Sequence, residues 1–211
     1  MSEKEIQGIS RFNRKELSSA FFVLLLMIIG SKTRLLLGEI PLVFTDAIVI
    51  AWTLYRRFPL SILPTVLFLM MGTLGLPVFA SGLTGAAAWE SKTAGYLAGY
   101  LLVSLLPVWL MKKEALKLSE MFIWGLLLYL TLQASGMTLL IYRHEMSIEA
   151  FIKNVFIPLA PFGITKTIIA VGIVHGLKKI NLFYVMIKEI FIYNIHRAYF
   201  NSLKMDLMKM D

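Results

Sequence analysis

The 211-residue sequence contains no cysteine, so disulfide bonds, thiolate metal sites and cysteine nucleophiles are all excluded. Charged residues are also scarce, at 16% of the chain, whereas hydrophobic residues make up 58%. Soluble domains are closer to half apolar and a quarter charged. With a mean hydropathy of +0.74, this composition predicts an integral membrane protein.

The sequence motifs of hydrolases, metalloenzymes and nucleotide-binding proteins are missing as well. The three histidines fall in different segments without the paired spacing of metal ligands, at His144, His175 and His196. No serine lies in a G-x-S-x-G elbow, and no G-x-x-x-x-G-K-[ST] phosphate loop occurs. We therefore expect no enzyme activity, no metal site and no cofactor. An ATP-driven process would need other subunits to bind the nucleotide.

What the sequence does contain is a succession of apolar stretches, most of them near the roughly 20 residues that a membrane-spanning helix needs. We predict six spans, at residues 17–29 with a continuation past Gly30 to Leu37, 41–55, 58–75, 93–111, 121–142, and a sixth that begins between Pro158 and Gly163 and ends near Gly176. The predicted fold class is all-α. Residues 1–180 would form one six-helix transmembrane domain of a polytopic membrane protein.

The residues after the sixth span follow a different pattern. Residues 182–207 place apolar side chains at helical spacing, with Lys188, Arg197 and Lys204 among the polar positions. This pattern is typical of an amphipathic helix that lies on a membrane surface. We therefore predict that residues 181–211 form a C-terminal amphipathic extension on the inner face, with a frayed, dispensable tail as the alternative.

The basic residues are distributed unequally between the two predicted sides of the membrane. With the N-terminus in the cytoplasm, 15 of the 21 lysines and arginines fall on inside segments and 5 on outside segments. Without the tail beyond Lys179 the ratio is still 11 to 5. Because short cytoplasmic loops are enriched in basic residues, we predict a multi-pass protein of the cell (inner) membrane with both termini inside. The net charge of +8 then reflects orientation in the lipid bilayer, and no nucleic-acid partner is expected.

Glycine, alanine and serine dominate the connection between the third and fourth predicted spans. Residues 70–100 read MMGTLGLPVFASGLTGAAAWESKTAGYLAGY. Small residues let backbone approach backbone, or a ligand, closely. Non-helical backbone at membrane depth has to be buried in protein or line a cavity. We interpret this stretch as one wall of a small-molecule site on the outer face, with an ordinary glycine-rich turn as the alternative.

The same stretch resembles the signature of the BioY family, the biotin-binding S components of energy-coupling-factor (ECF) vitamin transporters. The matching positions are GLPVF at residues 75–79, GYL at 95–97, and Gly72, Ala80, Gly82, Thr93 and Gly99. The departures from the family pattern are Ser81, Ser91, Lys92 and Ala94. The resemblance implies an S-component-like bundle with biotin as the ligand. It also implies a transmembrane T component and two ATPase subunits as possible partners.

Lys166 is predicted to lie one turn into the sixth span, after a helix start at Pro161 and Gly163. An ionisable side chain there is costly without a partner and is a functional candidate by default. An ammonium beside a helix N-terminus suits a carboxylate ligand, although lysines near helix ends also commonly extend to the lipid headgroups. The resemblance favours biotin binding, because the family carries a P-G-D-x-x-K run here. Gly163 stands where that run has aspartate.

Asp46 is the other ionisable candidate, one to two turns into the second span. It could offset the charge of Lys166 or accept hydrogen bonds from a ureido group, and a solitary acid near the outer interface is the alternative. Aromatic side chains could form apolar walls for a thioether ring and an acyl chain. The predicted substrate site comprises Lys166, Tyr96, Gly82, Gly85, Phe79, Gly95 and Asp46.

Together these features predict biotin uptake, in which the chain captures biotin at the extracytoplasmic face as the S component of an ECF-type transporter. Two alternatives remain open. The missing aspartate at Gly163 is compatible with an S component for another small carboxylated vitamin. An integral membrane enzyme acting on lipid headgroups is the second alternative, against which stands the lack of paired carboxylates or a histidine cluster for acid–base chemistry.

Overall fold

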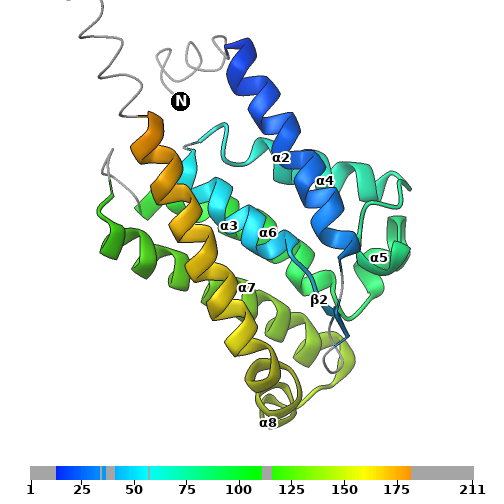
Figure 1. Ribbon diagram of the computed structural model, residues 1–211. Coiled ribbons are helices and arrows are strands. Elements are labelled where there is room, and N and C mark those ends of the chain that lie inside the picture. The colour runs from blue at the N-terminus through cyan, green and yellow to red at the C-terminus, as the bar shows by residue number, and fades with distance from the viewer. Residues whose placement is uncertain (1–12, 34, 37–40, 57, 111–115, 182–211) are drawn as a thin grey trace, which may run out of the picture. The chain divides into compact units, whose positions relative to one another are not determined.

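The computed structural model of the chain describes residues 13–33, 35–36, 41–56, 58–110 and 116–181 (Figure 1). The chain divides into two compact units, Met1–Val174 and His175–Asp211. All the elements and contacts below belong to the first unit, except that its last helix continues to Asn181. The amphipathic helix predicted at residues 182–207 lies outside the described residues, and the predicted domain boundary at residue 180 stays a prediction.

The first described helix, α2 (Arg14–Lys32), is capped at its N-terminus by Asn13 and Glu16, which satisfy each other's backbone N–H groups in a capping box. The helix ends at Lys32, and the chain turns back through a short antiparallel pair, β1 (Leu35–Leu36) with β2 (Pro41–Leu42). The span thus continues past Gly30 only to Lys32, and its predicted continuation through Leu35 and Leu36 is wrong, because these residues form β1. Hydrophobicity alone does not distinguish a helix end from a short apolar strand.

Two short helices follow, α3 (Thr45–Tyr55) and α4 (Leu63–Thr73), with 11 residues each. At 1.5 Å per residue each is about 17 Å long, roughly half the hydrocarbon thickness of a bilayer. The predicted spans at 41–55 and 58–75 are thus helical over only part of their length. The first residues of α3 pack closely against α2, because a Cβ at Gly30 would lie only 3.1 Å from the backbone nitrogen of Thr45.

The glycine-rich connection contains two short helical segments, η1 (Ala80–Gly82) and α5 (Gly85–Glu90). It leads into α6 (Ala94–Leu110) and then α7 (Leu118–His144), whose bounds agree with the predicted spans to within a few residues. A Cβ on Gly95 would lie 2.6 Å from the carbonyl oxygen of Ser135. Gly99, one turn further, faces the side chains of Leu132 and Ser135. The Gly95-x-x-x-Gly99 spacing therefore brings α6 close to α7, against its backbone at Gly95 and against its side chains at Gly99, as small residues do between membrane helices.

The last helix runs from Ile148 to Asn181 and begins at least ten residues before the predicted start of the sixth span. Its first turns form α8 (Ile148–Phe151), followed by a π-helical segment, η2 (Ile152–Phe156). Figure 1 shows the turns labelled α8 almost end-on, whereas the following turns run along the drawing, so the helix bends near η2. Pro158 comes two residues after this segment and lacks the N–H of a regular helix. A π-helical turn is a common place for such an irregularity. Pro158 and Pro161 therefore lie inside the helix, and the helix start predicted between Pro158 and Gly163 is wrong.

Within the described residues, two helices are long and apolar enough to cross a membrane, Leu118–His144 and Ile148–Asn181. The helices Thr45–Tyr55, Leu63–Thr73 and Ala94–Leu106 are apolar but shorter. Large apolar side chains also point outward from the fold. Phe22 and Leu25 on α2 are 61% and 58% exposed, and Ile169 on the last helix is 56% exposed. Extensive apolar exposure of this kind suits a lipid environment better than water.

Candidate substrate pocket

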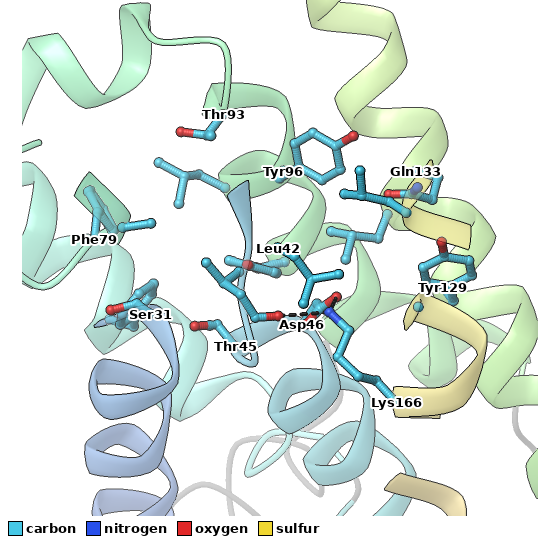
Figure 2. Close-up of a pocket in the computed structure, with 18 residues that line it drawn as sticks. Ser31, Leu42, Thr45, Asp46, Phe79, Thr93, Tyr96, Tyr129, Gln133 and Lys166 are labelled. Carbon is cyan, nitrogen blue, oxygen red and sulfur yellow. Dashed lines mark hydrogen bonds and ion pairs between the residues drawn. The ribbon is translucent and has the colours of Figure 1, made fainter. Parts of the chain in front are cut away.

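A pocket of about 690 Å³, counted out to its opening, lies among the helices of the first unit (Figure 2). Its lining comes from the end of α2, the β2–α3 segment, α4, the glycine-rich connection, α6, α7 and the last helix. Segments far apart in the sequence therefore meet around one space.

The charged part of the pocket is an ion pair between Lys166 and Asp46. The Lys166 ammonium donates to the Asp46 carboxylate over 2.6 Å and to the carbonyl oxygen of Val43 over 2.7 Å. The two side chains are only 10% and 14% exposed. Asp46 therefore offsets the charge of Lys166, and the interpretation of a solitary acid at the interface is wrong.

The helix start at Pro161 and Gly163, predicted to place Lys166 near free N–H groups, is also wrong. Lys166 lies in the middle of the helix Ile148–Asn181. The first four N–H groups of a helix are the ones without helical partners. A ligand at Lys166 is therefore not stabilised by a helix N-terminus, and the positive charge that it meets comes from the side chain alone.

Aromatic side chains form the apolar wall of the pocket. The ring of Phe68 on α4 packs edge-on against Phe79, with centroids 5.3 Å apart, and near Tyr100, with centroids 6.5 Å apart. The Phe79 ring lies directly over Gly72, where a Cβ would come within 2.1 Å of it. The packing of Phe79 therefore requires glycine at position 72. Phe79, which belongs to the GLPVF motif, lines the pocket.

The GLPVF segment is held by the C-terminal end of α2. The Lys32 ammonium donates to the carbonyl oxygens of Pro77 and Phe79, and the Ser31 hydroxyl donates to that of Val78. These bonds satisfy backbone carbonyl oxygens in a loop that lies outside the regular helices and strands. The wall that carries Phe79 is therefore fixed to α2 rather than left as a free turn.

The polar side chains in the pocket differ in whether the protein already satisfies them. Thr45 donates to the carbonyl oxygen of Met27, and the hydroxyl groups of Thr93 and Ser91 bond each other. In contrast, the hydroxyl groups of Tyr96 and Tyr129 and the Nε2 of Gln133 are buried without a hydrogen-bond partner among the described residues. Tyr96 lies on α6, and Tyr129 and Gln133 lie on α7.

Four of the predicted site residues lie in this pocket: Lys166, Asp46, Phe79 and Tyr96. Three others, Gly82, Gly85 and Gly95, are not part of the pocket lining that the structure describes. Gly82 and Gly85 have φ of +72° and +57°, so glycine serves the backbone conformation of the connection there. Gly95 serves the contact between α6 and α7. The structure therefore gives these glycines a part in turns and helix packing, and their predicted contact with the ligand stays a prediction.

Replacing Gly82 with alanine is expected to lower stability by about 1–2 kcal/mol and to leave ligand affinity within about twofold. The cost is that of a left-handed conformation for a residue with a Cβ, since the open space beyond Gly82 has no atom within 4 Å of such a Cβ. Thermal unfolding and equilibrium ligand binding of the purified variant would measure both effects. A large loss of affinity at unchanged stability would return Gly82 to the binding site.

Tyr129 and Gln133 line the pocket but were not predicted from the sequence. The contact of Tyr129 with Gly163 was not predicted either. A polar residue in the middle of a long apolar helix is a functional candidate by the same argument that singled out Lys166. Gln133 in α7 could therefore have been predicted as a site residue from the sequence. Tyr129 could not, because tyrosines are common in membrane helices. The contact between Tyr129 and Gly163 joins residues 34 positions apart, and no local pattern reveals it.

Comparison with known proteins agrees with this architecture. The model of the BioY family matches residues 3–182. The biotin transporter BioY of Thermotoga maritima is 26% identical over 179 residues, which cover 80% of this chain and 98% of that protein. The crystal structure of an S-component for biotin from an ECF-type ABC transporter superposes with a TM-score of 0.70 at 20% identity, over 85% of this chain and 95% of that one. The all-α fold is therefore that of an S component, and the chain belongs to the BioY family of membrane transport proteins.

Proposed function

We propose that this chain binds biotin in the pocket and acts as the substrate-binding component of an ECF-type transporter for biotin uptake. The observation that carries the proposal is the pocket itself, which combines an aromatic wall with a few buried polar groups. Such a lining suits a ligand with an apolar ring and chain and a small number of hydrogen-bonding atoms. The names of the relatives identify that ligand as biotin for those proteins.

Lys166 was predicted to bind the carboxylate end of biotin. The Lys166 ammonium has three N–H donors, and two of them are used by Val43 and Asp46. One donor is left for a ligand oxygen. Because Asp46 offsets the charge, the attraction for a carboxylate is weaker than that of an unpaired lysine. The contact between Lys166 and the carboxylate therefore stays a prediction.

The proposed orientation has both termini in the cytoplasm and the pocket reached from outside in a multi-pass arrangement. The distribution of lysine and arginine supports it, with 15 on inside and 5 on outside segments. The sequence has no phosphate-binding loop of its own. A transmembrane T component and two ATPase subunits would therefore supply the energy for release of biotin inside the cell.

Binding of labelled biotin to the purified protein in detergent or lipid nanodiscs is the direct test. We expect saturable binding to a single site, displaced by unlabelled biotin and not by other carboxylated vitamins such as lipoate or pantothenate. Stronger displacement by one of those compounds would instead identify the chain as an S component for another vitamin. Absence of biotin binding to a protein that unfolds cooperatively would refute the proposal.

A further inference from the structure

Tyr129 and Gln133 lie one turn apart on the same face of α7 and both line the pocket. Tyr129 is only 3% exposed and Gln133 only 5%. Neither the Tyr129 hydroxyl nor the Gln133 Nε2 has a hydrogen-bond partner among the described residues. Buried polar groups of this kind are costly unless something satisfies them. Two such groups on one side of a pocket indicate a ligand with matching polar atoms.

Gly163 is the reason why Tyr129 can occupy this position. A Cβ at Gly163 would lie 2.3 Å from the ring carbons and the hydroxyl oxygen of Tyr129. The tyrosine hydroxyl thus packs against the backbone of the last helix, in space that any larger side chain at position 163 would occupy. In this chain the pocket has a tyrosine hydroxyl there in place of a side chain at position 163.

The surroundings of these two groups carry little net charge. Lys166, one turn beyond Gly163 on the last helix, is paired with Asp46. Figure 2 shows Tyr129 and Gln133 on the same side of the pocket as this pair. A phenol and a primary amide are neutral donors. An uncharged carbonyl oxygen has two lone pairs and can accept both bonds without bringing a further charge into the pocket.

We propose that Tyr129 and Gln133 are specificity-determining residues that together donate to the carbonyl oxygen of a neutral cyclic ligand head, the ureido oxygen if the ligand is biotin. This inference rests on the proposed function. It assigns the ureido end of biotin to α7. It also explains how a pocket without a carboxylate at position 163 recognises that end.

Biotin binding to Tyr129→Phe and Gln133→Leu tests the assignment. Each variant removes one neutral hydrogen bond, so we expect affinity to fall about three- to tenfold in each. Tyr142→Phe is the matched control, because Tyr142 lies on the same helix and is 83% exposed. It should bind as the wild type does. Thermal unfolding of each variant shows whether the fold is intact, and Gln133→Leu keeps the test decisive if Tyr129→Phe is unstable.

Discrimination between ligands separates direct contact from a structural effect. In 2-iminobiotin a protonated imino group replaces the carbonyl oxygen at neutral pH and cannot accept the two bonds. The wild type should prefer biotin over 2-iminobiotin, and this preference should shrink in both variants and persist in Tyr142→Phe. If both variants keep the affinity and preference of a wild type that binds biotin, this inference is wrong and the proposed function stands. If the wild type does not bind biotin, the proposed function fails first and the inference with it.

Discussion

Replacing Lys166 with methionine is expected to weaken biotin binding at least tenfold and to lower stability by about 3–5 kcal/mol. The substitution keeps a long side chain but removes the ammonium. The Asp46 carboxylate, 2.6 Å away and with its side chain only 14% exposed, then loses its counter-ion. Removing one partner of a buried pair leaves an uncompensated charge, which is the main cost. Equilibrium binding of labelled biotin and thermal unfolding measure the two effects, and Lys153→Met, at an exposed position of the same helix, is the control.

The double variant Asp46→Asn/Lys166→Met shows what the pair does. If the pair acts as a neutral structural unit, the double variant should be more stable than Lys166→Met, since no charge is left unpaired. If Lys166 also contacts the carboxylate of biotin, binding should stay weak in the double variant even though stability returns. Biotin methyl ester, which lacks the carboxylate charge, should then bind Lys166→Met no worse than biotin does. Wild-type affinity in Lys166→Met would exclude any part for this lysine in binding.

The fold could be predicted from the sequence where helices are long and uninterrupted. The spans at 93–111 and 121–142 agree with α6 and α7 because apolar composition and helix length coincide there. The prediction failed where backbone chemistry, rather than hydrophobicity, decides the ends. Thr33 caps α2 before an apolar strand pair, and Pro158 follows a π-helical segment inside a continuous helix. Composition does not encode either event, because both depend on which backbone hydrogen bonds the tertiary structure makes.

The pocket could be predicted only from residue types that are unusual for a membrane helix and from the family motif. Lys166 and Asp46 were identified because charge is costly there, and Phe79 and Tyr96 through the motif that resembles the BioY family. The pairing of Lys166 with Asp46 spans 120 positions, and no local sequence pattern reveals it. Gly82, Gly85 and Gly95 were assigned to the ligand since glycine allows close approach, but the sequence does not say what approaches.

Gly95 lies where α6 approaches the backbone of α7. Gly95→Ala is expected to lower stability by about 1–3 kcal/mol or more, which corresponds to a fall of several degrees in the unfolding temperature. The new Cβ would lie 2.6 Å from the Ser135 carbonyl oxygen and 2.8 Å from the Gly136 Cα. Both are backbone atoms of α7 and cannot rotate away. The helices therefore have to separate, which moves Tyr96 relative to Tyr129 and Gln133, so biotin affinity should fall along with stability.

Gly172→Ala makes the same chemical change at a position without this constraint. Gly172 lies in the last helix, and a Cβ there would have no atom within 4 Å. Since alanine is about 1 kcal/mol more favourable than glycine inside a helix, this variant should be as stable as the wild type or more so. Thermal unfolding of the two variants side by side, followed by biotin binding, separates helix packing from helix propensity. Gly95→Ala with wild-type stability would mean that α6 and α7 do not pack backbone to backbone. Stable protein with lost affinity would instead return Gly95 to the ligand, as the motif alone first suggested.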